Sequence, residues 1–445
     1  MLLNLAAWLQ GVMPEWGFLR IFQYITFRAV MAAMTALLIG IAFGPWVIRR
    51  LTELKIGQPV RTYAMQTHLA KNGTPTMGGV LVLLAIAVAT LLWFDLSNRF
   101  VWIVLLVTFG FGAIGWVDDW RKVVRKDPEG MRSREKFMWQ TLVGLLAVLL
   151  LAFSLLGNST QEAWALFTQW VAAGLPLDFA PENAARLTLL VPFFKEIGYP
   201  AGVLGFVVLS FCVVVGTSNA VNFTDGLDGL AAGVIGIGAV AFFAYVYALT
   251  RWTSPESYTS LAATIVAALI GICAGFLPHN FHPATIFMGD SGSMQLGLIS
   301  AAGTIIVTGQ IDPGSFGGTA AIPVFLPILL PLMVLLLPVA DMVRLIVRRT
   351  MSGHSPFHAD RMHMHHRLLA AGHSHRRAVL VMYIWAAVAA FSCAGLAFLR
   401  VRVVAVGAAV AVVAAVAVTV DLMPGLRLTW ARRIGARHVR RAGRR

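Results

Sequence analysis

Long apolar runs separated by short polar segments follow one another along almost the whole chain. A membrane-spanning helix needs about 20 predominantly apolar residues, and eleven runs reach or approach that length. They lie at residues 22–48, 79–94, 100–117, 137–156, 200–216, 229–249, 261–278, 293–309, 321–343, 378–399 and 401–420. Only Leu399–Arg402 separates the last two runs, so ten spans remain an alternative. The pattern predicts an all-α, polytopic membrane protein with 10–11 transmembrane helices.

The composition supports the same class. Apolar residues make up 58% of the 445 residues, charged residues make up 12%, and the mean hydropathy is +0.77. Soluble domains are about a quarter charged, so a soluble enzyme and a disordered protein are excluded. The long apolar blocks also differ from the short alternating segments of an outer-membrane barrel. The three cysteines lie inside apolar runs, which excludes a disulfide framework.

The basic residues predict the orientation. Lys and Arg number 35 against 20 Asp and Glu, and such an excess is typical of cytoplasmic loops near anionic lipid, so no nucleic-acid partner is expected. The basic segments are 49–76, 118–136 and 344–377, whereas 95–99, 157–199 and 310–320 contain few basic residues. With the N-terminus outside, every basic segment faces the cytoplasm. We expect one membrane domain over 1–426 and a basic cytoplasmic tail over 427–445.

The long external segment, 157–199, contains an apolar and aromatic pattern near 161–173. Such a pattern is typical of a helix that lies on the membrane surface. The same topology places the polar segments 217–228 and 279–292 in the cytoplasm.

The polar segments on that side carry the candidate chemistry. Asp118 and Asp119 end the third run and precede Lys122. Adjacent carboxylates recruit a cation or shift a pKa, Mg²⁺ prefers such oxygens and shares them with phosphates, and Lys122 is placed to neutralise a phosphate. A solvated helix cap is the alternative interpretation.

The segment 219–230 combines two Asn, two Asp and two Gly between two apolar runs. Asn222, Asp225 and Asp228 offer groups that suit a base, a ribose or a metal, and Gly226 permits a close backbone approach. A plain polar turn needs fewer such residues. This pattern therefore favours a binding function.

Two further segments begin apolar runs. Residues 287–293 place Asp290 and neighbouring serines at a helix start, where an N-cap is the simple alternative to an anion site. Residues 74–79 follow Lys71 and include Thr76, and both side chains are suited to hold a phosphate. A plain helix start is the alternative there.

The segment from His354 to His375 contains seven of the eleven histidines. Zinc binding is one interpretation, although the spacing is irregular and no Cys assists. Recognition of an anion or sugar is the favoured one, and a basic interfacial loop is the third. Taken together, the cytoplasmic segments suit a Mg²⁺-dependent reaction between a phosphorylated soluble donor and a membrane-held acceptor.

The motifs themselves carry a family resemblance. THxxKxGTPTMGG (67–79), VDDxRKV (117–123), SNAVNxTDGLDGLAAG (218–233) and FMGDSGS (287–293) resemble the polyprenyl-phosphate N-acetylaminosugar-1-phosphate transferases. Up to about residue 230 the chain is most similar to the phospho-N-acetylmuramoyl-pentapeptide transferases. Beyond that point it is more similar to the UDP-N-acetylglucosamine–undecaprenyl-phosphate transferases, through 275–294 and 358–380.

The resemblance implies a reaction and its partners. Undecaprenyl phosphate attacks the β-phosphate of a UDP-N-acetylaminosugar, and UMP leaves. It implies a multi-pass protein of the bacterial inner membrane with its active site on the cytoplasmic face, in contact with membrane lipid, and leaves a homodimer open. The longer match implies a donor that carries N-acetylmuramoyl-pentapeptide, and N-acetylglucosamine is the alternative.

Residue roles are implied at the matching positions. Asp290 and Asp225 bind Mg²⁺, with Mn²⁺ as an alternative, and together with Asp118 and Asp119 form the catalytic carboxylates. Substrate contacts are implied for Lys71, Thr76, Lys122, Asn222, Gly226, Leu227, Asp228, Phe287, His363, His365 and His366. A transporter is the rival from another class, but it predicts ionisable residues at mid-membrane, where Arg28 is the clearest charge.

Overall fold

The computed structural model describes residues 1–54, 74–125, 127, 130–176, 179, 187–190, 198–200, 202–250, 258–308, 329, 332–333, 336–353 and 364–420. Its α-helices are α1 (Leu2–Val12), α2 (Ile25–Glu53), α4 (Gly79–Trp93), α5 (Arg99–Val124), α6 (Ser133–Leu156), α7 (Thr160–Ala172), α8 (Gly202–Thr224), α9 (Leu230–Thr250), α10 (Tyr258–Asn280), α11 (Gly289–Thr308), α13 (Leu336–Met351), α14 (Met364–Ala370), α15 (His375–Gly395) and α16 (Val401–Thr419). A 3-10 helix, Gly17–Gln23, joins α1 to α2. The short strands β1 (Thr188–Leu190) and β2 (Gly198–Pro200) pair antiparallel.

Eight of the described helices are long and apolar enough to cross a membrane: α2, α5, α6, α8, α9, α10, α15 and α16. The predicted class, an all-α polytopic membrane protein, is confirmed. The runs at 79–94 and 293–309 lie on α4 and α11. The run 321–343 lies mostly outside the described residues. Its predicted end was wrong, because α13 continues to Met351 with an amphipathic sequence that keeps the helical period.

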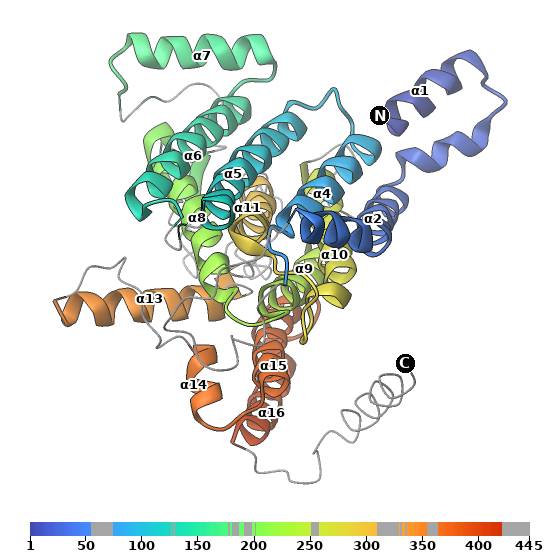
Figure 1. Cartoon of the computed structure of the whole chain (residues 1–445). Helices are drawn as coiled ribbons and strands as arrows, with labels where there is room; N and C mark the ends of the chain where they lie inside the picture. Colours follow the sequence, from blue (N-terminus) through green and yellow to red (C-terminus); the bar gives the residue numbers. More distant parts are fainter. Residues whose placement is uncertain are drawn as a thin grey trace.

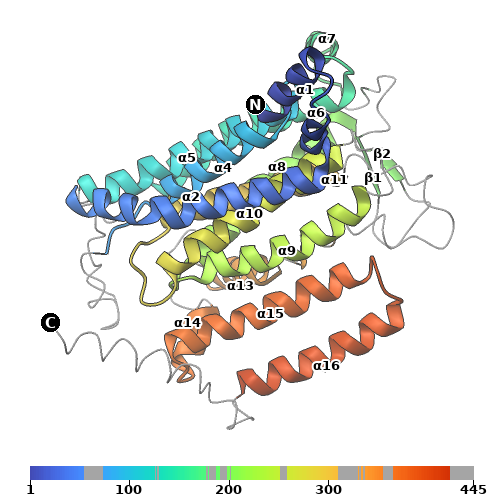
Figure 2. The same ribbon diagram turned by 90° about the vertical axis from the view of Figure 1, so that its right-hand side faces the viewer.

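The helices form a bundle whose long axes run side by side (Figure 2). In the view along that axis (Figure 1), α11 occupies the centre and contacts α4, α5, α8, α9 and α10. The hairpin of α15 and α16 packs onto α9 through α15. Most of α16 is exposed, as expected for a helix that faces lipid. By contrast, α13 runs sideways out of the bundle.

Small residues allow the closest helix contact, that of α2 with α10. A Cβ added at Gly40 would lie 2.8 Å from the Cα of Gly275. Within a membrane, such small residues let helix backbones approach and pack. The contact fixes the end of α10, which carries part of the site.

One end of the bundle carries the N-terminus, and its described basic residues include Arg99 and Arg400. There the N-terminal ammonium donates hydrogen bonds to the carbonyls of Leu91 (2.6 Å) and Phe94 (3.3 Å) at the end of α4. The helix predicted near 161–173 is present as α7, which runs crosswise to the bundle helices at this end (Figures 1 and 2), and its place on a membrane surface stays a prediction. Arg28 also lies near this end, in the first turn of α2, where it donates to Ser260 Oγ at 2.8 Å.

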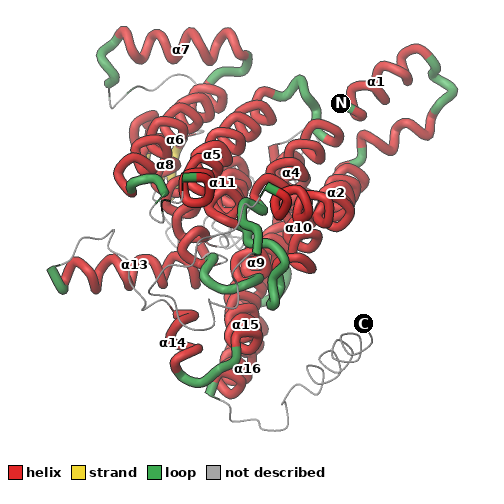
Figure 3. The backbone as a smooth tube through the Cα atoms, in the orientation of Figure 1, coloured by secondary structure: helices red, strands yellow, loops and turns green. Residues whose placement is uncertain are grey.

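We call the other end the basic end. Helices α2, α5, α8 and α10 end there, and α4, α6, α9, α11 and α15 begin there. Figure 3 shows the loop between α8 and α9 beside the loop between α10 and α11 at this end. Segments far apart in the sequence are thus brought into one region.

Candidate active site

Four charged side chains meet at the basic end. Lys122 Nζ lies 3.0 Å from Asp118 Oδ2 and 2.8 Å from Asp290 Oδ2. Lys136 Nζ lies 3.1 Å from the same Asp118 oxygen and 2.6 Å from the same Asp290 oxygen. Two carboxylates therefore share two ammonium groups. We call Asp118, Lys122, Lys136 and Asp290 the charge cluster.

Helix geometry explains how the cluster forms. Asp118 and Lys122 are four residues apart on α5, so they lie on one face. Lys136 lies in the first turn of the antiparallel helix α6, and Asp290 lies in the first turn of α11. The Asp118 side chain is only 3% exposed, and buried charges persist only when they are paired. The two lysines supply that pairing.

Two further contacts hold the α5–α6 side of the cluster. The other oxygen of Asp118 accepts the backbone N–H of Met131 at 2.6 Å. Arg121 on α5 donates two hydrogen bonds of 2.7 Å to the carboxylate of Glu135 on α6. A bidentate pair of this kind fixes geometry as well as charge. The segment between α5 and α6 thus orients Asp118 and Lys136.

Asp119 has a different environment from its neighbour. It is 1% exposed and accepts hydrogen bonds from the backbone N–H groups of Asp290 and Ser291, both at 3.2 Å, and from Ser291 Oγ at 2.9 Å. It therefore caps the N-terminus of α11 from a neighbouring helix. The left-handed φ of Gly289 (+73°) turns the chain into this contact. Asp119 positions the helix that carries Asp290.

The end of α8 joins the same region. Ser293 Oγ on α11 donates to Asn222 Oδ1 at 2.7 Å, and Asn219 Nδ2 donates to Gln140 Oε1 on α6 at 3.0 Å. Asp225 follows directly after α8, partly buried, and its backbone N–H bonds to the carbonyls of Val221 and Asn222. The predicted residues of 219–225 therefore lie beside α11 and α6.

The segment before α4 lies against the segment before α11. The N–H groups of Gly78 and Gly79 donate to the carbonyls of Phe287 and Met288, both at 2.9 Å. Thr76 is 1% exposed, and its hydroxyl has no hydrogen-bond partner among the described residues. An orphaned buried hydroxyl costs free energy unless a ligand satisfies it. Lys71 lies outside the described residues.

The loop after α8 is anchored from two sides. Gly229 N–H donates to Asn280 Oδ1 at 3.0 Å, which ties the loop to the end of α10. Asp228 Oδ2 lies 2.9 Å from His282 Nδ1 and 3.9 Å from His375 Nε2. Gly226 is partly exposed and Leu227 is buried. The predicted loop is thus linked to both α10 and α15.

The remaining predicted residues belong to the histidine-rich segment. His363 lies outside the described residues. His365 and His366 lie on α14, and their side chains are outside the description. Their predicted contact with the sugar or diphosphate stays a prediction.

Lys136, Asn280 and His282 were not predicted as site residues, whereas Ser291 was a candidate helix cap and His375 belonged to the histidine-rich segment. Lys136 lies within a basic cytoplasmic segment whose charge had been attributed only to orientation. Ser291, Asn280, His282 and His375 contact predicted residues across long sequence separations. The one sequence signal for them is their place inside or beside the polar cytoplasmic segments.

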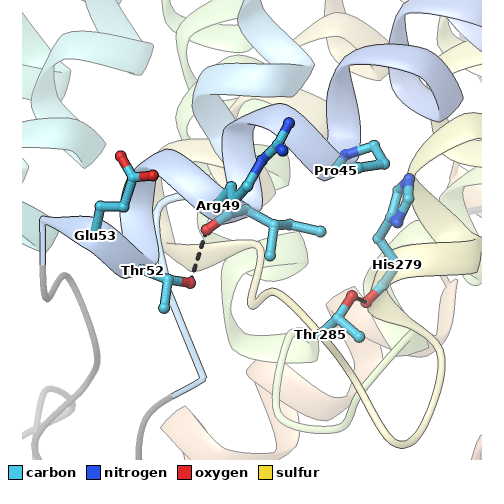
Figure 4. A pocket seen from close by; sticks show the side chains of 7 residues that line it. Pro45, Arg49, Thr52, Glu53, His279 and Thr285 are labelled. Carbon is cyan, nitrogen blue, oxygen red and sulfur yellow. Dashed lines mark hydrogen bonds between the residues drawn. The ribbon is translucent and has the colours of Figure 1, made fainter.

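A cavity of about 530 Å³ opens at the basic end between α2 and α10 (Figure 4). It is lined by Pro45, Ile48, Arg49, Thr52, Glu53, His279 and Thr285. None of these belongs to the charge cluster. The wall is mostly apolar and carries the Arg49 guanidinium and the His279 imidazole beside the Glu53 carboxylate, so among the described lining residues Arg49 is the one fixed cation for the anionic headgroup of an amphiphile.

The donor set of the charge cluster fits a hard divalent cation. Asp118 Oδ2 and Asp290 Oδ2 converge closely enough to contact the same ammonium groups. Carboxylate oxygens are the ligands that Mg²⁺ takes together with substrate phosphates. The two lysines add phosphate-binding charge beside them. The arrangement suits chemistry on a diphosphate.

Comparison with protein families agrees with this chemistry. The model of glycosyl transferase family 4 matches residues 101–308, which run from α5 to the end of α11. The phospho-N-acetylmuramoyl-pentapeptide-transferase signature 1 matches residues 71–83, which contain Lys71 and Thr76. The two matches together include every predicted site residue outside the histidine-rich segment.

Proposed function

Because the chain belongs to the polyprenyl-phosphate N-acetylaminosugar-1-phosphate transferases of glycosyl transferase family 4, we propose a specific reaction for this membrane enzyme. It transfers a phospho-N-acetylaminosugar from a UDP-sugar to undecaprenyl phosphate. An oxygen of the lipid phosphate forms a bond to the β-phosphorus of the donor. The bond from that phosphorus to the bridging oxygen breaks, and UMP leaves with the electron pair.

One observation carries the proposal: Asp118 and Asp290, 172 residues apart, share the ammonium groups of Lys122 and Lys136. A site that stabilises charge on a transferring phosphoryl group needs fixed cations and oxygen ligands in one place. Lys122 and Lys136 are placed to exchange their carboxylate contacts for the donor diphosphate. Asp118 is placed to orient the acceptor phosphate.

The residues fit a Mg²⁺ ion as cofactor. Asp290, whose carboxylate converges with that of Asp118, would hold it, and the sequence motif of 219–230 is the ground for proposing Asp225 as a further ligand. Bound there, Mg²⁺ supplies charge stabilisation to the phosphates. Asp119 acts through α11 by keeping Asp290 in position. Nucleoside and sugar contacts are proposed for the other predicted residues: Asn222, Gly226, Leu227, Asp228, Phe287, His363, His365 and His366.

The cavity between α2 and α10 gives a place for the acceptor headgroup. Its wall includes Arg49 and His279, and it lies between α2 and α10, two helices that are long and apolar enough to span a membrane. We propose that the phosphate of the polyprenyl acceptor is held there as it approaches the charge cluster. We also propose that the protein lies in the bacterial inner membrane and that its active site faces the cytoplasm.

For the donor, we propose UDP-N-acetylmuramoyl-pentapeptide, which gives the first lipid intermediate of peptidoglycan synthesis. The signature match at 71–83 supports this choice. UDP-N-acetylglucosamine is the alternative, favoured by the sequence of the histidine-rich segment.

A donor assay distinguishes the two. Purified protein is incubated with undecaprenyl phosphate, Mg²⁺ and either donor, and UMP release and the lipid product are measured. Product from the muramoyl-pentapeptide donor supports the proposal, and product from N-acetylglucosamine alone replaces it with the alternative. Movement of a substrate across vesicles without UMP release would support a transporter instead.

A further inference from the structure

A second cluster of metal-ligating side chains lies outside the charge cluster. It consists of Asp228 from the loop after α8, His282 from the loop after α10, and His375 from the first turn of α15. One ligand atom from each residue lies within 4.8 Å of the other two. We call these residues the histidine–aspartate trio. Three elements that are distant in sequence each supply one ligand.

The ligand chemistry differs from that of the charge cluster. Imidazole nitrogens favour Zn²⁺ and its neighbours over Mg²⁺. Two histidines and one carboxylate, with a fourth position left for water or another ligand, are the donor set of several zinc sites. The trio therefore selects a borderline transition metal where the charge cluster selects a hard cation.

The distances match a tetrahedral ion. With metal–ligand bonds of about 2.0–2.1 Å, ligand atoms lie about 3.3 Å apart. Asp228 Oδ2 lies 2.9 Å from His282 Nδ1 and 3.9 Å from His375 Nε2. The distance to His282 is therefore shorter than the tetrahedral value, and the distance to His375 is longer. Small side-chain movements would bring Asp228 Oδ2 to the required separation from both nitrogens, and all three ligand atoms lie within 4.8 Å of one another.

The protonation pattern also fits. The backbone N–H of Asp228 donates to His375 Nε2 at 3.1 Å, so Nε2 is the unprotonated ring nitrogen, and a bound ion would take the lone pair that accepts this hydrogen bond. His282 can bind a metal through Nδ1 in the neutral tautomer that carries its proton on Nε2. The two rings stack with centroids 4.2 Å apart, which holds both nitrogens on the side of Asp228.

The surroundings support the ligands. The Asp228 side chain is 3% exposed, and its Oδ2 also accepts the N–H of Ala284 at 3.4 Å. Arg376 Nε donates to the carbonyl of His282 at 3.0 Å and fixes that residue's backbone. Outer contacts of this kind orient metal ligands. His282, with a 34% exposed side chain, leaves an entry path.

From this geometry we propose that Asp228, His282 and His375 bind one Zn²⁺ ion. The ion would join the loop after α8 to the start of α15. A consequence for activity rests on the proposed function. Because Asp228 belongs to the proposed donor site, a Zn²⁺ ion bound to Asp228 prevents this side chain from contacting the donor and inhibits transfer.

Metal binding is tested without any substrate. Purified full-length protein in detergent with excess Mg²⁺ is titrated with Co²⁺, followed by its visible absorption, and then with Zn²⁺ in competition. We expect one Co²⁺ per chain with tetrahedral absorption, displaced by Zn²⁺. His282→Asn and His375→Asn each remove a metal ligand. Each should raise the Kd for Co²⁺ by more than the roughly 10–100-fold that follows when a residue hydrogen-bonded to a ligand is replaced.

The matched control is His373→Asn, which removes a nearby imidazole outside the trio and should leave the tetrahedral signal intact. Metal-free unfolding temperatures show whether each variant is folded. Absence of binding to wild type, or an undiminished signal in both trio variants, overturns the proposal. Neither result depends on transferase activity, so the two proposals fail independently.

Discussion

The carboxylate of Asp119 holds Ser291 by two hydrogen bonds, one from its backbone N–H at 3.2 Å and one from its hydroxyl at 2.9 Å. A side chain of α5 thus satisfies the free N–H groups at the start of α11. Its neighbour Asp118 faces the lysines instead. Adjacent carboxylates, which look equivalent in the sequence, therefore have separate roles: one anchors α11 and the other belongs to the charge cluster.

We expect Asp119→Asn to destabilise the protein. The substitution replaces a charged acceptor of three hydrogen bonds with a neutral amide, and hydrogen bonds to charged groups contribute about 1.5–3 kcal/mol. Thermal unfolding in detergent should show a lower midpoint, accompanied by reduced turnover because Asp290 is displaced. Glu53→Gln is the control, since its exposed pair with Arg50 contributes at most about 1 kcal/mol. Equal midpoints for wild type and Asp119→Asn would disprove the anchoring role.

Gly289→Ala tests the turn into α11. The residue has a φ of +73°, and an added Cβ would lie 2.5 Å from Asp119 Oδ2. Non-glycine residues in this region cost about 1–3 kcal/mol, and the clash adds to that. Gly216→Ala on α8 is the control, because nothing lies within 4 Å of its added Cβ. We expect a lower unfolding midpoint for Gly289→Ala alone, and similar midpoints for both variants would argue against the turn.

Lys136→Met tests the unpredicted member of the charge cluster. Removing one fixed donor from a site that stabilises developing charge typically lowers kcat by about 100–1,000-fold. We expect a loss of that size in steady-state UMP release. Arg134→Met removes an exposed cation two residues away and should leave the rate within about twofold of wild type. If the two variants behave alike, Lys136 has no role beyond membrane orientation.

Arg49→Gln tests the cavity. Loss of a charge-assisted contact to the acceptor phosphate should raise the KM for undecaprenyl phosphate about tenfold while the KM for the donor stays unchanged. Arg134→Gln is the control, because Arg134 is an exposed cation on α6 that does not line the cavity. Equal acceptor KM values in both variants would place the acceptor elsewhere.

Much of the fold follows from the sequence because apolar length alone decides which segments can span a bilayer. The run 100–117, for example, lies within α5 (Arg99–Val124). The pair Asp118 and Lys122 also follows, because four-residue spacing on a helix places them on one face. The C-terminal end of α13 could not be predicted from the sequence, because hydropathy marks the apolar run and not the amphipathic turns beyond it.

The convergence of distant segments is harder to predict. Lys136 meets Asp290 across 154 residues only because α6 and α11 begin at the same end of the bundle and pack near α5. No local pattern around Lys136 separates it from the other basic residues of its loop. The same holds for His282 and His375, whose stacking depends on how α15 packs onto α9.

The most direct test of the account is Mg²⁺-dependent UMP release by Asp290→Asn. Wild type should release UMP only when the UDP-sugar, undecaprenyl phosphate and Mg²⁺ are all present. Asp290→Asn should lose this activity by about 1,000-fold or more, since it removes the proposed ligand of the metal, while its unfolding profile stays cooperative. Turnover near the wild-type rate with an unchanged Mg²⁺ dependence would contradict the assignment of the charge cluster as the catalytic site.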